Sequence, residues 1–206
     1  MTEILYKDKY IVVCIKPCGL LSEGTGKDSL PALLADELSE GGTPAKIFPV
    51  HRLDRDTRGI MVYARTEKSA AILSAAIASH EFEKEYIATV CGKPQEDSGI
   101  MEDLLFYDRQ RNKSFVVKRE RKGVKKATLS YGLVSYDETT NTSKVKILLG
   151  TGRTHQIRVQ FASRGLPLVN DRKYGAPAAD TDEPSLIARR LKFFHPKTKE
   201  RMEFVL

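Results

Sequence analysis

Hydrophobic and polar positions form short alternating or continuous apolar runs along most of the chain, a pattern typical of β-strands. These runs cover residues 4–6, 10–15, 60–64, 84–90, 127–134, 144–149, 186–194 and 202–206. Turn residues such as Gly92 and Gly150–Gly152 separate them. Many short strands with a few separate helices, rather than a regular alternation, predict an α+β fold with a mostly antiparallel central sheet.

Three stretches have the apolar spacing of helices, and we expect them to flank the sheet. They begin near residues 30, 67 and 155, and each follows a residue that can cap a helix: Asp28 or Ser29, Thr66 and Thr154. Gly165 is a natural stop for the last. The expected inward-facing residues are Leu30, Leu33 and Leu34 in the first, Ala71, Ile72, Ala75, Ala76 and Ile77 in the second, and Ile157 and Phe161 in the third.

The length of 206 residues suits one domain or a compact pair of subdomains sharing a sheet. No apolar run approaches the roughly 20 residues of a membrane helix, and the amino terminus has no pattern of a signal peptide. We therefore expect a cytoplasmic protein. The three cysteines form no paired zinc motif and the four histidines are scattered, so we expect no metal. A turn-rich stretch is expected from Gly165 to Asp182.

Positive charge is concentrated in one segment. The net charge is +7, and residues 109–126 alone hold nine Lys or Arg against one acid, Glu120. Phe115–Val117 lies between these charges, which favours a hairpin with basic edges. Such a segment is typical of nucleic-acid binding, although a solvated, mobile basic loop has the same composition.

A loop dense in ionisable residues, 49–59, leads directly into the apolar run 60–64. Asp54 and Asp56 alternate there with arginines. Charges at the edge of a core need partners or a chemical role, because an unpaired buried carboxylate is costly. One interpretation is a self-neutralised surface loop. The other is a catalytic carboxylate kept ionised by a guanidinium. Motifs for dinucleotides, for phosphate loops and for a serine nucleophile are absent from the sequence.

Several motifs resemble those of RluA-type RNA pseudouridine synthases, from Asp8 to Val205. They are His51-Arg52-Leu53-Asp54 with Thr57 and Gly59, Lys84-Glu85-Tyr86, Gly152-Arg153-Thr154-His155-Gln156-Ile157-Arg158, Asp171 to Gly175, and Leu191 to Pro196. Two positions depart from the family pattern: Arg58 replaces a usual Ser, and Asn170 a usual Gly.

The resemblance implies the pseudouridine synthase fold, with a cleft across the sheet, and isomerisation of a specific uridine in rRNA or tRNA. It implies a single catalytic domain over residues 1–206 without a separate amino-terminal RNA-binding domain. It also implies that neither a metal nor an organic cofactor takes part. The expected partner is structured RNA, and we expect a monomer that binds no membrane.

Residue roles follow from the same resemblance. Asp54 is the catalytic aspartate, acting either as nucleophile or as base. Arg158 pairs with Asp54, and Tyr86 packs against the target base. Arg52 helps to flip the nucleotide out of its stack, and Leu191 supplies an apolar wall. We assign RNA docking to the basic segment, in particular to Lys113, Lys118, Arg119, Arg121 and Lys122.

Taken without the resemblance, these residues have simpler interpretations. Tyr86 is then a core aromatic residue and Arg158 a charge on a helix surface. Asp56 is expected to pair with Arg55 or Arg58, and His51 and His155 to be structural hydrogen-bonding residues. A non-catalytic RNA-binding or RNA-chaperone module is the alternative function. A carboxylate glycosidase would need a second, well-placed acid, and Asp56 is too near Asp54 to supply it.

Overall fold

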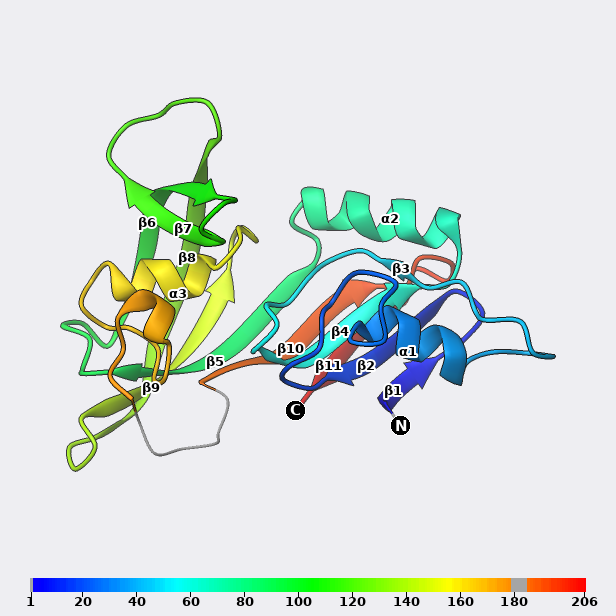
Figure 1. Ribbon diagram of the computed structural model, residues 1–206, viewed down its shortest axis with the longest axis horizontal. Coiled ribbons are helices and arrows are strands. Elements are labelled where there is room, and N and C mark those ends of the chain that lie inside the picture. Colours follow the sequence, from blue (N-terminus) through cyan, green and yellow to red (C-terminus); the bar gives the residue numbers. More distant parts are fainter. Residues whose placement is uncertain (1, 179–184) are drawn as a thin grey trace. The chain divides into compact units, whose positions relative to one another are not determined.

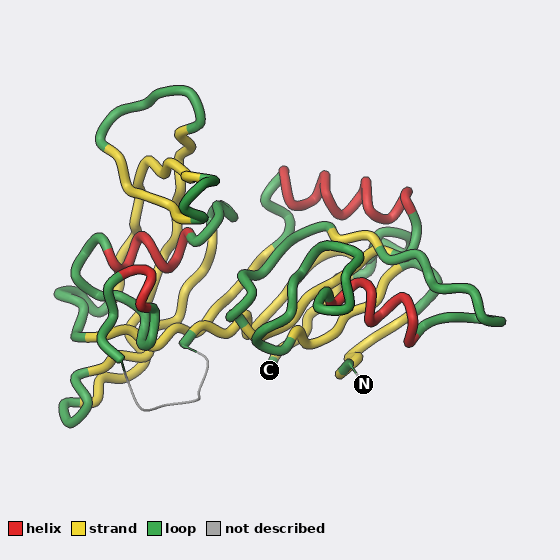
Figure 2. Tube along the Cα trace, in the orientation of Figure 1, coloured by secondary structure: helices red, strands yellow, loops and turns green. Residues whose placement is uncertain are grey.

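The computed structural model describes residues 2–178 and 185–206, which fold as two compact units (Figure 1). Unit 1 consists of Met1–Lys84 and Ile187–Leu206, and unit 2 of Glu85–Leu186. Part of the predicted turn-rich stretch, residues 179–182, lies outside the described residues. Figure 2 shows strands joined by loops and turns, with helices interspersed, as the apolar pattern predicts.

Unit 1 is built on strands in the order β1–β2–β4–β10, with β3 paired to β4 and β11 to β10. Only the β4–β10 pair is parallel among the pairs that the structure describes in this unit. The bounds are β1 Glu3–Lys7, β2 Ile11–Lys16, β3 Phe48–Pro49, β4 Arg58–Ala64, β10 Leu186–Phe194 and β11 Arg201–Val205.

Two helices belong to unit 1, α1 (Leu30–Glu37) and α2 (Glu67–Ala78). Leu73 of α2 packs in a core cluster with Ile11, Ile60 and Val62, so this helix covers one face of β2 and β4. Every residue of β4 from Gly59 to Ala64 is buried, so the strand after the charged loop 49–59 is covered on both faces. Within the described residues, no helix is long and apolar enough to span a bilayer.

Unit 2 is an antiparallel sheet in the order β5–β9–β8–β6–β7. Its strands are β5 Glu83–Cys91, which starts in unit 1, β6 Ser98–Asp108, β7 Lys113–Val117, β8 Val124–Asp137 and β9 Thr142–Leu149. The α-helix α3 (Gln156–Ala162) and the 3-10 turn η1 (Arg172–Tyr174) pack on this sheet through Val159 and Tyr174, which contact Leu105 and Ala127. The predicted α+β class with a mostly antiparallel sheet is confirmed.

Three local predictions about the helices were wrong. Leu33 is 36% exposed, so only Leu30 and Leu34 of the three leucines are buried. In α2 the inward face is formed by Ser69, Ala70, Leu73 and Ile77, whereas Ala71 and Ala75 are exposed. The N-cap of α3 is His155 rather than Thr154, and it lies in the left-handed region with φ of 53°. The cap of α2 is correct, since Thr66 accepts a hydrogen bond from the Ser69 N–H.

Candidate functional site

The Asp54 carboxylate is carried by a tight turn at the start of β4. The Thr57 N–H donates to the Asp54 carbonyl oxygen at 3.0 Å, which closes the turn. Leu53 and Thr57 on either side are buried, whereas Asp54 is half-buried. The local fold therefore fixes the backbone of Asp54 while its own side chain is only partly covered.

Residues from the start of the chain hold this turn from both sides. The Ser22 hydroxyl donates to the Leu53 carbonyl at 2.7 Å and accepts from the Leu53 N–H at 3.0 Å. The Lys16 ammonium donates to the carbonyls of Arg55 and Pro17, both at 2.8 Å. Lys16 is fully buried. The sequence does not indicate this role of Lys16, because a contact across some forty residues leaves no local signal.

Burial lowers the pKa of the Lys16 amine to about 8. Coulombic attraction to Cys18, Asp56 and Asp54 acts in the opposite direction but does not cancel it. The amine joins the carbonyl of Pro17 to that of Arg55, which also accepts from the Gly19 N–H at 2.9 Å. Lys16 therefore supports the Asp54 turn through hydrogen bonds and adds positive charge close to the carboxylate.

Gly59 follows the turn at a position where only glycine fits. Its φ is +141°, and a Cβ atom there would lie 2.3 Å from the Ala188 carbonyl oxygen. This close approach is where β4 and β10 run parallel, with Gly59 opposite Ala188. The glycine of the motif thus has a packing reason: it lets β10 lie directly against the strand that follows Asp54.

His51 is a structural residue, as predicted. Its Nε2 accepts a hydrogen bond from the Val62 N–H at 3.1 Å, and its ring lies 5.4 Å from that of Phe82. Burial, reinforced by the positive charge of Lys84, lowers the pKa of the imidazole to about 3. The ring is therefore neutral at physiological pH and joins the loop to β4.

Of the two predicted partners of Asp56, Arg55 pairs elsewhere, and pairing with Arg58 stays a prediction. The Arg55 guanidinium lies 3.9 Å from the Asp28 carboxylate and donates to the Gly19 carbonyl, instead of pairing with Asp56. Arg52 lies 3.9 Å from the Glu23 carboxylate, and both side chains are more than half exposed. Arg58, the departure from the family pattern, is exposed at the start of β4. Arg52 is thus accessible, as a role in nucleotide flipping would require.

Arg158 of α3 forms a bidentate ion pair with Asp171. Its Nε lies 2.6 Å from Oδ2 of Asp171 and its Nη2 lies 2.8 Å from Oδ1. Its Cζ also lies 5.1 Å from the centroid of the Tyr174 ring. The predicted pairing of Arg158 with Asp54 is not tested by these contacts and stays a prediction. The role of Asp171 was missed, because the motif that contains it gave no indication of a partner.

The start of α3 explains why the motif around Arg158 has its particular residues. The Gln156 side-chain oxygen accepts from the Thr151 hydroxyl at 2.7 Å and from the Arg153 N–H at 3.0 Å. Its amide donates to the Thr128 carbonyl of β8 at 3.0 Å. One glutamine therefore closes the helix start and attaches it to the sheet. The imidazole of His155 beside it has the structural role predicted for it, through a 2.9 Å contact with the Tyr174 hydroxyl.

Asn170, the second departure, occupies a left-handed conformation with φ of 62°. Asparagine tolerates this region better than other residues with a side chain. The replacement of the usual glycine therefore preserves the backbone that leads into Asp171.

The two apolar candidates are both buried. Tyr86 of β5 is 5% exposed and lies opposite Ile147 of β9. Leu191 of β10 is 2% exposed and belongs to the core cluster of unit 1. The burial of Tyr86 agrees with its simpler core interpretation. Contact of Tyr86 with a base and the apolar wall at Leu191 stay predictions.

The basic segment forms the β6–β7 turn, β7 and the loop before β8, as the predicted hairpin requires. Lys118, Arg119, Arg121 and Lys122 are exposed in that loop, and the Arg121 Cζ lies 4.8 Å from the Phe106 ring centroid. Lys113 is half-buried, with its Nζ 5.1 Å from the ring centroid of Tyr174. Four of the five predicted docking cations thus face solvent together.

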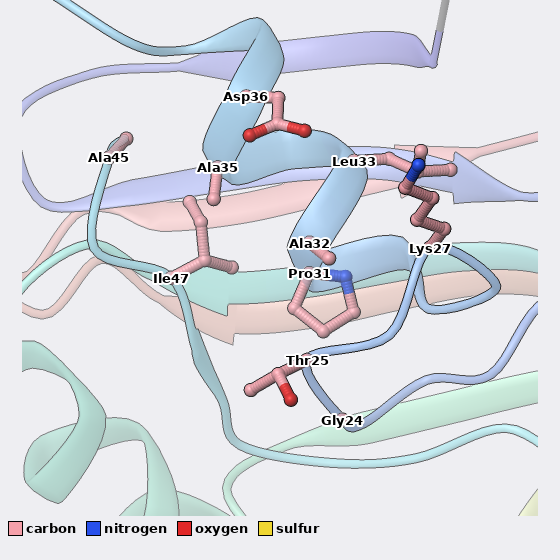
Figure 3. A pocket seen from close by; sticks show the side chains of 10 residues that line it. All are labelled: Gly24, Thr25, Lys27, Pro31, Ala32, Leu33, Ala35, Asp36, Ala45 and Ile47. Atoms are coloured by element: carbon pink, nitrogen blue, oxygen red, sulfur yellow. The ribbon is translucent and has the colours of Figure 1, made fainter. Parts of the chain in front are cut away.

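A pocket of about 360 Å³ lies in unit 1 beside α1 (Figure 3). Pro31, Leu33 and Ile47 line it, with Lys27 and Asp36 as charged members. This lining accounts for the exposure of Leu33. The pocket contains none of the predicted site residues.

Comparison with known proteins decides the family. The family model described as RNA pseudouridylate synthase matches residues 10–163. The chain belongs to this family. RNA pseudouridine synthase is therefore its enzyme class, and the predictions of family, fold and isomerase chemistry are confirmed.

Two relatives illustrate the similarity. The chain is 33% identical over 207 residues to the dual-specificity RNA pseudouridine synthase RluA of Escherichia coli (strain K12), covering 98% of this chain and 90% of that protein. It is 33% identical over 218 residues to an uncharacterized RNA pseudouridine synthase of Aquifex aeolicus, covering 98% of this chain and 68% of the relative. The chain thus spans about two thirds of the second protein's length.

A solved structure supports the fold. Human RNA Pseudouridylate Synthase Domain Containing 1 is similar with a TM-score of 0.81 and 20% identity, covering 100% of this chain and 83% of that one. At this identity the likeness concerns the fold alone.

Proposed function

We propose that this RNA pseudouridine synthase uses Asp54 as its catalytic carboxylate on a uridine of structured rRNA or tRNA. In the isomerisation the bond between N1 of uracil and C1′ of the ribose breaks, and the base turns in place. A bond between C5 and C1′ then forms, C5 loses its proton and N1 gains one, so the product has the atoms of the substrate. Asp54 acts at the sugar as nucleophile or as base.

The observation that carries this proposal is the support of the Asp54 turn. Ser22 fixes the backbone before Asp54 and Lys16 fixes the backbone after it, through hydrogen bonds of 2.7 to 3.0 Å. A catalytic group needs such a rigid backbone, because a small displacement of the group lowers the reaction rate strongly. Asp56, two residues further on, is exposed at the tip of the same turn and has the simpler role of a solvated charge.

The other roles follow the family motifs. Arg158 is proposed to pair with Asp54 and keep it ionised, and Tyr86 to pack against the uracil. Arg52 assists the flipping of the nucleotide, and Leu191 forms an apolar wall. The exposed cations of the loop before β8, together with Lys113, bind RNA phosphates. We retain a cytoplasmic, monomeric enzyme as the sequence-based prediction.

Replacement of the carboxylate tests the proposal. RNA from cells that lack the gene is treated with wild-type protein, Asp54→Asn or Asp56→Asn, and pseudouridines are mapped. We expect no product from Asp54→Asn, with RNA affinity within about two-fold of wild type because the amide keeps the shape of the side chain. Asp56→Asn is the matched control and should form product normally.

Two outcomes would contradict the proposal. Product at the wild-type level from Asp54→Asn would remove Asp54 from the mechanism. Tight binding of structured RNA by the wild-type protein, with no pseudouridine formed in any rRNA or tRNA pool, would favour the non-catalytic RNA-binding module instead.

A further inference from the structure

Two residues of the segment that follows α3, Asp171 and Tyr174, hold the Arg158 guanidinium. The bidentate pair with Asp171 fixes both its position and its plane, because two parallel N–H···O bonds allow little rotation. The two side chains are only 15% and 6% exposed. A buried ion pair of this kind contributes little net stability, because desolvation offsets the attraction. A role in geometry is therefore the better reason for its presence.

Tyr174 is fixed in turn by two hydrogen bonds at its hydroxyl. The Ser114 N–H lies 2.8 Å from the hydroxyl oxygen, and the His155 Nδ1 lies 2.9 Å from it. A backbone N–H only donates, so the hydroxyl oxygen accepts from Ser114. The contact with His155 Nδ1 is a second hydrogen bond, whose direction is set by the tautomer of the imidazole. These bonds hold the Tyr174 ring against Arg158.

The backbone of the segment is equally well defined. The Tyr174 N–H donates to the Asp171 carbonyl at 3.0 Å, and the Asp171 N–H donates to the Leu168 carbonyl at 3.0 Å. Asn170 and Gly175 on either side have positive φ values. Asp171 and Tyr174 thus lie on one short, hydrogen-bonded turn, and their side chains contact the same guanidinium.

We propose that Asp171 and Tyr174 are positioning residues for Arg158, which hold its guanidinium in the orientation that the reaction requires. The pair with Asp171 uses one N–H of Nε and one of Nη2, and a guanidinium has five N–H donors. The bidentate pair fixes the plane of all five donors, and the Tyr174 ring lies 5.1 Å from the Cζ atom. The inference rests on the proposed role of Arg158 toward Asp54.

Single-turnover kinetics with Asp171→Asn tests the inference. Saturating enzyme is mixed with RNA labelled with tritium at C5 of uridine, and the released label is followed, while RNA affinity is measured separately. We expect the rate constant to fall at least about ten-fold and the affinity to change less than about two-fold, because only chemistry needs the orientation. Tyr174→Phe keeps the ring but loses both hydrogen bonds of the hydroxyl, so a smaller loss of rate is expected.

Asp103→Asn is the matched control. Asp103 pairs at 2.9 Å with Arg164, which lies just beyond the end of α3, so this variant breaks an ion pair to the same part of the chain without touching Arg158. Its rate should stay within about two-fold of wild type. Thermal unfolding identifies any variant that does not fold. If Asp171→Asn does not fold, the rate of Tyr174→Phe tests the inference instead, and a wild-type rate would overturn it.

A double-mutant cycle separates positioning from independent effects. Arg158→Lys keeps the charge and loses the fork geometry. If Asp171 acts through Arg158, adding Asp171→Asn to Arg158→Lys should lower the rate no further.

The outcomes separate this inference from the proposed function. A wild-type rate for Asp171→Asn, or an equal loss of rate in both backgrounds, would overturn only the inference about Asp171. A wild-type rate for Arg158→Lys in a protein that still requires Asp54 would overturn the role of Arg158, and the inference with it. Loss of the requirement for Asp54 would instead contradict the proposed function.

Discussion

Burial lowers the pKa of two residues that support the Asp54 loop, and both residues form hydrogen bonds to the backbone. Lys16 donates to two backbone carbonyls and has a pKa lowered to about 8. His51 accepts from the Val62 N–H and has a pKa lowered to about 3. Burial therefore disfavours the charged form of both side chains. Their hydrogen bonds join β2, the Asp54 loop and β4. These two residues therefore support the loop that carries Asp54.

His51 makes the fold sensitive to acid. Its pKa is about 3 in the folded protein and near 6.5 when unfolded. Its contribution to stability is thus complete above pH 6.5 and declines as the pH falls toward 3. Between pH 7 and pH 5 the free energy of unfolding should fall by about 2 kcal/mol through this group alone. Urea denaturation at both pH values measures the change.

His51→Gln should lose less stability than wild type between these pH values, because it has no proton to bind. His80→Gln, at an exposed position, is the control and should keep the wild-type dependence. If His51→Gln lost as much stability as wild type on acidification, another group would be responsible.

At the scale of elements, the parallel pairing of β4 with β10 depends on Gly59. Its φ of +141°, and the 2.3 Å that would separate a Cβ atom from the Ala188 carbonyl oxygen, leave no room for a side chain. Gly59→Ala should therefore lower the free energy of unfolding by more than about 2 kcal/mol, measured by chemical denaturation.

Gly132→Ala in β8 is the matched control, since a Cβ there meets nothing within 4 Å. It should change the free energy of unfolding by less than about 1 kcal/mol. Equal effects of the two substitutions would show that the close approach at Gly59 relaxes easily.

The elements themselves were largely predictable, because alternation along strands is a local property of the sequence. The cap at Thr66 was predictable for the same reason. The buried face of α2 was not, since its many alanines suit several faces and contact with the core selects the one with Leu73. The left-handed His155 was also missed. Gln156 takes the capping bonds from Thr151 and Arg153, so Thr154 is not needed as a cap.

At the scale of the whole molecule, the excess of positive over negative charge lies in one segment of unit 2, residues 109–126, while Asp54 belongs to unit 1. Neutralising Lys118, Arg119, Arg121 and Lys122 to Gln should weaken RNA binding. The slope of log affinity against log salt should become shallower by about two to four, since each lost phosphate contact lowers it by nearly one. The single-turnover rate at saturating protein should be retained.

The control removes four positive charges elsewhere, at Lys7, Lys9, Lys197 and Lys199, all exposed in unit 1. Its salt slope should match wild type. An unchanged slope in the first variant would count against the basic segment as the RNA-docking surface.

In the candidate site, only residues that belong to the family motifs were predictable from the sequence. Asp54, Tyr86 and Arg158 came from motif resemblance, and no spacing in the sequence would have chosen Asp54 over Asp56. The supports were not predictable: Ser22 meets Leu53, Lys16 meets Arg55, and Asp171 meets Arg158 through contacts that only the folded chain creates. Such partners are far apart in sequence and follow no periodic pattern.

Unit 1 is assembled from two pieces of chain, with Ile187–Leu206 returning to it after unit 2. During synthesis on the ribosome, the strands β5 to β9 of unit 2 emerge before β10 does, so β10 cannot yet pair with β4. The nascent chain is then able to form its cationic hairpin while Gly59 still lacks its neighbour Ala188. On the proposed docking role of this hairpin, the ability to hold RNA would mature earlier than the ability to modify it.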